Sequence, residues 1–359
     1  MIEDAENFVS LVAVGDIMLG DHPICIGHGV GSSLKCKEAG NLFSNVSHLL
    51  CKADITFGNL ECILSDIDIN LKSLSSVSLR GAEKSIYELK SAHFNVVSIA
   101  NNHVLEHGEF SLKRSKKLLQ QHGICAIGVA ESKKESRKVF VMNIKGIRIG
   151  FLAYCLIRDK TAYCSVDNEK EIIDDVRNAT SKVDILIVSM HWGDEFIRNP
   201  SPHQVELGHA IIDAGAKIIL GHHPHVLQGV EEYNGGIIAY SMGNFVFDMW
   251  QKKMRESMIL QCEFSKDRIL KYDIIPVLID KYYHPTIIQG DNGELLISQI
   301  KNDFLQRCGE DEYLHKVEEY RKQYRTSLRK HLVMNLYKYN IRYVFQLGSN
   351  FLNKIIKNT

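Results

Sequence analysis

The sequence of 359 residues lacks the features that would assign it to a special class of protein. Its 43 Lys and Arg are balanced by 43 Asp and Glu, so no overall positive field is available to hold nucleic acid. No run approaches the roughly 18 apolar residues of a membrane-spanning helix. The N-terminus carries Glu3, Asp4 and Glu6 where a secretory signal would carry Lys or Arg. We therefore expect a cytoplasmic globular protein with no transmembrane segment and no nucleic-acid partner.

The cysteines form no recognisable motif. The nine cysteines are an odd number and occur singly, without a Cys-x-x-Cys pair, as expected of reduced, mostly packed thiols in a cytosolic protein. Histidine is more informative, because the chain contains 16 and several stand where an apolar run ends.

Short apolar strands alternate with helical stretches over the first 290 residues. Strands are predicted at 8–14, 55–57, 95–100, 184–190, 217–220, 237–240, 257–264 and 272–278, and helices at 43–52, 83–92, 110–121 and 203–214. Residues 139–153 are predicted to form a hairpin that turns at Lys145-Gly146. Strands flanked by helices and followed by antiparallel-looking runs predict a layered α/β fold with the helices outside.

The C-terminal part of the chain has a different pattern. From about Gly293 it is helical, most strongly at 312–338, and residues 321–359 contain nine Lys or Arg and no acid. We predict a main domain at 8–285 and a basic helical extension at 290–359. A basic amphipathic helix can dock on its own domain, on a partner or on an anionic membrane surface.

Polar residues collect directly after the predicted strands. They are Gly15-Asp16, Gly58-Asn59-Leu60-Glu61, Asn101-Asn102-His103, His191-Trp192-Gly193 and Gly221-His222-His223-Pro224-His225. The carboxyl ends of strands are where α/β sheets bind ligands. Singly, Asp16 or Asn102 is an ordinary turn residue. Together these imidazoles, carboxylates and amide oxygens indicate a site for Mn, Fe or Zn, and two ions about 3.5–4 Å apart would suit phosphoryl hydrolysis.

This ordered set of motifs, with Ser241-Met242-Gly243-Asn244-Phe245 after it, resembles the CapA/PgsA family of bacterial capsule and poly-γ-glutamate synthesis proteins. The resemblance runs from about residue 9 to 280, and the family's domain is similar to the calcineurin-like metallophosphatases. It implies a layered metallophosphatase-like β-sandwich flanked by helices, with two divalent metal ions as cofactors.

The resemblance also implies roles for individual residues. Asp16 would bind the first metal and Glu61 would bridge both ions. The remaining ligands would be His225 on the first metal and Asn102, His191 and His223 on the second. His103 resembles the residue that protonates the leaving group.

One position departs from the metallophosphatase pattern. A histidine is usual two residues after the first Asp, and here that residue is Met18. The first metal site is therefore expected to be weaker, to be completed by water or His22, or to stay empty. His222 is an extra histidine, and a packed or supporting role suits it at least as well as ligation.

Other residues could contact the substrate. Arg80 could clamp an anion with two hydrogen bonds, or form a surface ion pair. Asn244 could hydrogen-bond a ligand or its own loop, and Trp192 and Glu195 could shape the pocket wall. Glu106, with His107, is expected at a solvated helix start.

Two functions follow from these features. The first is a metal-dependent hydrolase that acts on a phosphate ester or on an anionic substrate, small molecule or polymer, related to capsule or poly-γ-glutamate. The alternative is a non-catalytic metal-binding subunit that works with capsule or polymer synthesis proteins. Turnover of generic phosphate esters would favour the enzyme, and association with synthase subunits without turnover would favour the subunit.

Overall fold

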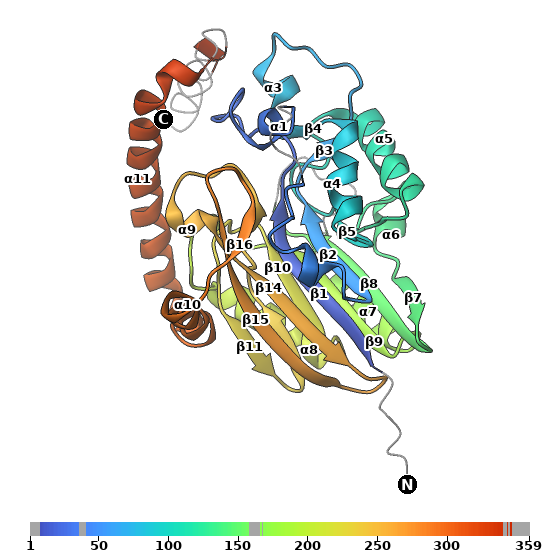
Figure 1. Ribbon diagram of the computed structural model, residues 1–359. Helices are drawn as coiled ribbons and strands as arrows, with labels where there is room; N and C mark the ends of the chain where they lie inside the picture. Colours follow the sequence, from blue (N-terminus) through green and yellow to red (C-terminus); the bar gives the residue numbers. More distant parts are fainter. Residues whose placement is uncertain are drawn as a thin grey trace.

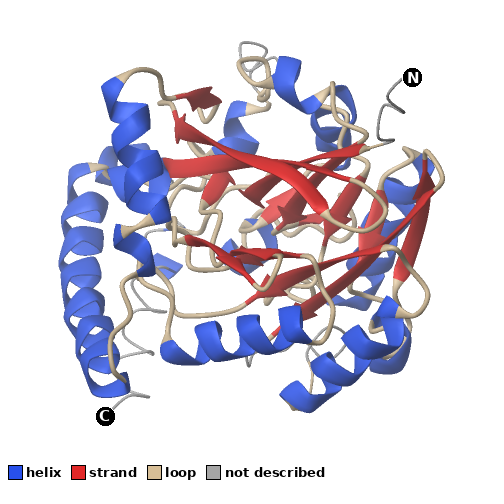
Figure 2. Ribbon diagram, turned by 90° about the horizontal axis from the view of Figure 1, so that it is seen from below, coloured by secondary structure: helices blue, strands red, loops and turns tan. Residues whose placement is uncertain are grey.

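Two β-sheets lie one above the other and form the centre of the protein, with helices on the outside (Figure 2). The computed structural model describes residues 8–35, 41–157, 166, 168–339, 343 and 345–346. The layered α/β architecture predicted from the sequence is confirmed. None of the helices in these residues is both long and apolar enough to cross a lipid bilayer.

The first sheet is built around β1 (Val9–Ile17). Parallel strands extend it on one side, namely β2 (Ile55–Leu60), β5 (Val96–Ser98) and β6 (Cys125–Ile127). Antiparallel strands extend it on the other, namely β14 (Glu256–Phe264), β15 (Ile269–Ile279) and β16 (Pro285–Ile287). The short strand β13 (Asn244–Val246) pairs in parallel with the end of β1. β1 is apolar on both faces because both are covered, as is usual for strands in parallel arrangements.

The second sheet has four parallel strands at its centre: β12 (Gly236–Ala239), β10 (Ile218–His222), β9 (Ile185–His191) and β8 (Ile147–Cys155). Antiparallel strands β11 (Val230–Tyr233) and β7 (Phe140–Ile144) form its edges. The predicted hairpin between β7 and β8 is confirmed. Lys145 and Gly146 have φ values of 52° and 80°, as a two-residue turn of type I′ requires.

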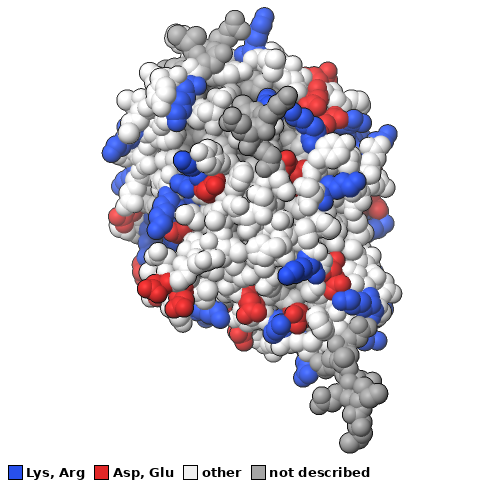
Figure 3. All heavy atoms as spheres, in the orientation of Figure 1, with Lys and Arg blue, Asp and Glu red and all other residues white. Residues whose placement is uncertain are grey.

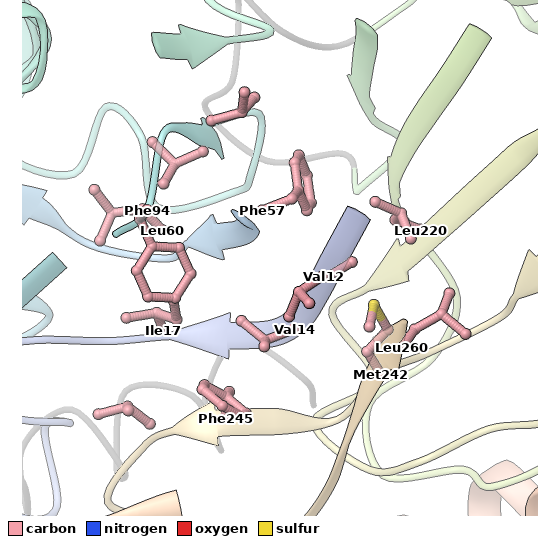
Figure 4. Packing of buried hydrophobic residues seen from close by; sticks show 14 of the residues in the cluster. Val12, Val14, Ile17, Phe57, Leu60, Phe94, Leu220, Met242, Phe245 and Leu260 are labelled. Atoms are coloured by element: carbon pink, nitrogen blue, oxygen red, sulfur yellow. The ribbon is translucent and has the colours of Figure 1, made fainter. Parts of the chain in front are cut away.

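The core lies between the two sheets. Phe57 of β2 stacks on Phe151 of β8 with ring centroids 6.4 Å apart. Figure 4 shows Phe57, Leu220 of β10 and Leu260 of β14 in one cluster of buried side chains. Packing across this layer fixes the strand ends of the two sheets relative to each other.

Helices cover the outer faces. The second sheet is covered by α7 (Glu169–Thr180) and α8 (Pro202–Asp213), whose apolar side chains form a separate cluster with β8, β9 and β10. Helices α4 (Ile86–Ser91) and α5 (Gly108–Gln121) belong to the half of the chain that forms β2, β5 and β6. The helix predicted at 43–52 is wrong in extent, because only α2 (Ser47–Leu50) is helical. Helix α7 was not predicted, although Asn168 caps it by accepting from the Glu171 N–H.

The C-terminal part consists of α10 (Asp291–Lys301) and the long α11 (Glu310–Met334), which runs along one side of the molecule (Figure 1). Tyr313 and Val317 of α11 pack with Ile197 of the main domain, and all three are buried. Farther along α11, Ser327 accepts hydrogen bonds from Trp250 and Gln251 at 3.2 and 2.9 Å. The helical character of this segment is confirmed. The division of the chain into a main domain at 8–285 and an extension at 290–359 stays a prediction. Of its nine cations, Arg342, Lys354 and Lys357 lie outside the described residues.

Candidate metal centre

The first sheet brings Asp16 and Glu61 together at the carboxyl ends of β1 and β2. Asp16 pairs in the sheet with Asn59 on one side and with Asn244 on the other. The Asn59 side-chain nitrogen donates to Asp16 Oδ1 at 2.8 Å and to Glu61 Oε2 at 3.2 Å. Both carboxylates are fully buried. Asn59 thus fixes the spacing of two charges that would otherwise repel each other.

The second sheet supplies the histidines. His191 and His222 end β9 and β10 and are paired across the sheet. The chain then turns so that His223 and His225 face the same place, and their φ values are 95° and 55°. Left-handed backbone is uncommon for residues other than glycine, and such strain is concentrated at functional sites. The positions of these two imidazoles are therefore imposed by the surrounding fold.

Side chains from both sheets converge into three overlapping groups of possible metal ligands. In each group the possible ligand atoms lie within 4.8 Å of one another. The first group is Glu61, His191 and His223, the second is Asp16, Glu61 and His225, and the third is Glu195, His223 and His225. Glu61 belongs to two of them, which is the arrangement a bridging ligand needs.

The bare polar atoms of this cluster fit a bound cation. Among the described residues, Glu61 Oε1, His191 Nδ1 and His223 Nδ1 are buried and have no hydrogen-bond partner. Buried polar atoms without partners are rare in folded proteins and call for an explanation such as an ion. Nitrogen and carboxylate oxygen donors suit Mn, Fe or Zn.

The electrostatics of the cluster favour metal-binding forms of its histidines. Burial holds the pKa of His191 well below its usual value and lowers the pKa of His223 to about 3, with neighbouring histidines adding to the effect. Neutral imidazole is the form that binds a metal. Burial and the charge of Asp16 raise the pKa of Glu61. Burial would also raise the pKa of Asp16, but the hydrogen bond and charge of His222 outweigh it and lower that pKa.

Asn102 and His103 follow β5 and reach the same cluster. Asn102 Oδ1 lies 2.8 Å from His191 Nε2, so two of the residues predicted for the second metal are in contact. His103 Nε2 lies 3.6 Å from Glu61 Oε1, and His103 Nδ1 lies 3.0 Å from Glu106. Glu106 is exposed, as the sequence suggested, but its contact with His103 was not predicted. The contact with Glu106 is an ion-pair distance without hydrogen-bond geometry, because His103 Nδ1 has no hydrogen-bond partner in the described part of the chain. His103 Nε2 also lies 3.4 Å from the Asn102 side-chain nitrogen.

Asn244 is buried and makes its hydrogen bonds inside the protein. Its nitrogen donates to the carbonyl oxygens of Met254 at 2.8 Å and of His225 at 3.2 Å, which identifies the other atom as oxygen. That oxygen lies 2.9 Å from His225 Nδ1. An amide oxygen only accepts, so His225 Nδ1 carries a proton and Nε2 is the nitrogen that could bind a metal. Asn244 therefore sets the orientation and tautomer of His225.

Arg80 is not directed at the cluster by any hydrogen bond in the described part of the chain. Its guanidinium donates to the carbonyl oxygens of Ser65 at 2.8 Å and Ile67, and to the Ser111 hydroxyl at 3.2 Å. These bonds tie β4 (Arg80–Gly81) to the loop after β3 (Ile63–Leu64) and to α5. The anion-clamping role of Arg80 stays a prediction.

Met18, His22 and His222, which the sequence analysis considered near the first metal, make different contacts. Met18 is buried, and its sulfur accepts from the Gly20 N–H at 3.1 Å. Burial and the nearby charges of His225 and His103 lower the pKa of His22 to about 3, which places His22 beside the cluster. His222 Nδ1 lies 3.1 Å from Asp16 Oδ1, a contact that supports the carboxylate.

Three neighbours of the motifs also have defined contacts. Trp192 is buried and donates through its indole nitrogen to the Tyr240 carbonyl at 2.9 Å, a structural role. His107 Nε2 lies 3.0 Å from the Ser78 carbonyl, so it is not simply solvated. Glu195 was assigned to the pocket wall from the sequence, whereas its carboxylate lies within ligand distance of His223 and His225. The only signal for this was its closeness to His191 in the chain.

Comparison with known proteins agrees with this geometry. The family model for bacterial capsule synthesis protein PGA_cap matches residues 10–249. The chain is 30% identical over 286 residues to capsule biosynthesis protein CapA of Bacillus anthracis, covering 76% of this chain and 68% of that protein. It is 29% identical over 282 residues to PGA biosynthesis protein CapA of Bacillus subtilis strain 168, covering 76% and 72%.

Among solved structures, a novel phosphatase of Mycoplasma pneumoniae is similar in fold. The TM-score is 0.51 at 12% sequence identity, over 76% of this chain and 94% of that one. This likeness confirms the fold expected from the sequence, a layered sandwich flanked by helices.

Proposed function

Because the chain belongs to the bacterial capsule synthesis protein PGA_cap family, we propose that it is a metal-dependent hydrolase of an anionic substrate, either a phosphate ester or a capsule-related compound. The observation that carries this proposal is the buried cluster of carboxylates and imidazoles with bare donor atoms. A structural metal site would not need His103, which stands beside the cluster and is partly exposed to solvent.

The ligand sets would be those of the three groups. One ion would be held by Asp16, Glu61 and His225, with Glu195 in reach. A second ion would be held by Glu61, Asn102, His191 and His223. Ions bound there would supply a water nucleophile of lowered pKa and neutralise charge on the reacting group.

The protein's own residues would orient the ligands and move one proton. Asn244 holds His225 through Nδ1, which leaves Nε2 to bind a metal, and Asn59 keeps Asp16 and Glu61 apart. His103 would give a proton from Nε2 to the leaving group, with the Glu106 carboxylate 3.0 Å from Nδ1. This division of roles separates metal binding from proton transfer, so the two can be tested by different substitutions.

The first test asks whether the cluster binds metal and supports turnover. Purified protein should bind Mn or Zn and hydrolyse p-nitrophenyl phosphate, and His191→Ala should lose both properties. His209→Ala is a matched control, because His209 pairs with Glu231 at 3.1 Å and belongs to none of the three ligand groups. Protein that binds no metal and is not stabilised by Mn or Zn would contradict the proposal.

A second candidate is favoured by the names of the relatives, which describe biosynthesis and not hydrolysis. In this alternative the metal centre would be part of a non-catalytic subunit that works with polymer synthesis proteins. Protein that binds metal, turns over no phosphate ester and binds a synthase subunit would support this alternative and exclude the hydrolase.

A further inference from the structure

A cavity of about 240 Å³ lies beside the metal centre, between α11 and the loop 196–199. Its lining includes Phe196, Arg198, Lys253, Lys316, Glu319 and Tyr320. Helix α11 supplies one wall, and the loop with Lys253 of α9 (Lys252–Arg255) supplies the other. Figure 3 shows Lys and Arg side chains along the edge of the molecule where Figure 1 places α11.

We propose that this cavity is a subsite for an anionic group, a carboxylate or phosphate that the substrate carries beyond the group reacting at the metal centre. The inference rests on the proposed function, because it assigns the cavity to the same substrate. It gives α11 a role in substrate selection.

The first argument is the balance of charge around the cavity. Arg198 is paired with Glu256, and Lys316 is paired with Glu312 at 2.9 Å. Lys253 has no carboxylate partner among the residues that the structure describes. Its ammonium lies 3.3 Å from the centre of the Tyr320 ring. A cation over an aromatic face is held in place without being neutralised, so it can still pair with an incoming anion.

The second argument is the half-buried position of Lys253. Burial and the charge of Arg198 lower the pKa of the Lys253 amine to about 8. Arg198 is paired with Glu256, whereas Lys253 has no carboxylate beside it among the described residues, so an oxyanion bound there would favour the charged form of Lys253. Charge-assisted hydrogen bonds from such groups are stronger than neutral ones.

The lining also contains one carboxylate, that of Glu319. It accepts a hydrogen bond from the Gln323 side chain at 3.1 Å, one turn farther along α11. Gln323 lines the cavity too, and its neutral amide holds the carboxylate without removing its charge. Since Arg198 and Lys316 already have carboxylate partners, Lys253 is the cation of this lining that an incoming anion would pair with.

Phe196 connects the cavity to the metal centre. Its ring centroid is 6.1 Å from that of His225 and 4.5 Å from that of Tyr324 on α11. Its backbone is held at φ 71°, and its N–H donates to the Pro224 carbonyl at 2.6 Å. A ring fixed in this way separates the two sites by a single side chain, so one extended substrate could occupy both.

Binding can be tested on metal-loaded full-length protein by calorimetry with three peptides: triglutamate, triglutamine and a diphosphoserine peptide. We expect Lys253→Met to weaken binding of at least one anionic peptide about tenfold, the usual worth of one charge-assisted hydrogen bond. Lys253→Arg should retain binding. Lys252→Met is the control, because Lys252 is the adjacent residue and does not line the cavity. A loss confined to triglutamate identifies a carboxylate, and a loss confined to phosphoserine identifies a phosphate.

Kinetics test the link to the reaction. A phosphotyrosine peptide with two following Glu residues should have a lower KM than the same peptide with Gln, and Lys253→Met should abolish that difference without changing kcat. If no phosphate ester is hydrolysed, the hydrolase proposal fails while the calorimetry still decides the subsite. The subsite proposal would be wrong if folded Lys253→Met protein bound each of the two anionic peptides as tightly as wild type does.

Discussion

Asn244→Leu distinguishes the two roles that the sequence leaves open for Asn244, a hydrogen bond to a ligand or a hydrogen bond within the protein. Leucine has the same branching and number of heavy atoms as asparagine, although it is bulkier, and it neither accepts nor donates hydrogen bonds. The substitution removes the acceptor for His225 Nδ1 at 2.9 Å and the donors to the Met254 and His225 carbonyls at 2.8 and 3.2 Å. All of these groups lie in the protein interior, so water cannot replace the lost partners.

The size of the effect follows from those three bonds. A hydrogen bond contributes about 1 kcal/mol net, and a buried group left without a partner costs about 1–3 kcal/mol. We expect the free energy of unfolding without metal to fall by about 2–4 kcal/mol. Loss of a partner that orients a metal-binding histidine typically lowers metal affinity about 10–100-fold. That range corresponds to about 1.4–2.8 kcal/mol at 25 °C.

Metal affinity would be measured by competition with a chelator, and stability by urea unfolding of the metal-free protein. Asn244→Asp should retain more affinity than Asn244→Leu, since a carboxylate still accepts from His225. Asn143→Leu, at an exposed position of β7, is the control. If Asn244→Leu left metal affinity unchanged and raised only KM, the positioning role would be wrong and the substrate-binding role would stand.

Three further outcomes follow from the structure. His103→Ala should keep its metal and lose about 10²–10⁴-fold in turnover, least for substrates with very good leaving groups; wild-type rates on poor leaving groups would exclude His103 as the acid. Tyr313→Ala should lower the free energy of unfolding by about 3–5 kcal/mol, because Tyr313 is only 2% exposed. An unchanged midpoint of urea unfolding would instead show that α11 is a separate unit. Burial and the charge of Asp21 raise the pKa of Asp248 to about 8 from 3.8. Its protonated form therefore stabilises the fold below about pH 4, and that contribution is lost as the pH rises to about 8. The stability of Asp248→Asn relative to wild type should rise by about 1.4 kcal/mol per pH unit in this window, and parallel pH profiles would contradict that pKa.

The central strands were predictable because their sequences are apolar without alternation, whereas the short strands β6, β11 and β16 were not predicted. Such runs, as in β1 and β9, belong to strands covered on both faces, and no competing signal interrupts them. The segment 43–52 failed because its apolar residues suggested a helix, yet Phe43 and Val46 are buried with only one helical turn after them. β13, three residues long, depends on pairing with β1 and has no sequence pattern of its own.

The grouping of the ligand residues was predictable for a topological reason. Parallel strands end at the same edge of a sheet, so Asp16 and Glu61 had to lie close together. Their hydrogen bonds to Asn59, and that of Asn244 to His225, depend on side-chain positions that spacing does not give. Glu195 depends on the loop whose next residue, Phe196, is in left-handed backbone, a conformation that no motif indicates.

The candidate metal centre draws its side chains from both sheets, and they extend from Asp16 to His225 in the chain. Contacts between residues so distant in sequence form slowly, because much of the chain must be ordered first. The ligand set is therefore complete only after the two sheets have packed, so an ion would bind the finished sandwich and not its halves. An ion that binds only the native state stabilises that state by about 2.7 kcal/mol when the free metal concentration is 100 times Kd. The supply of metal in the cell would thus set how long the folded protein survives before proteolysis, independently of its effect on turnover.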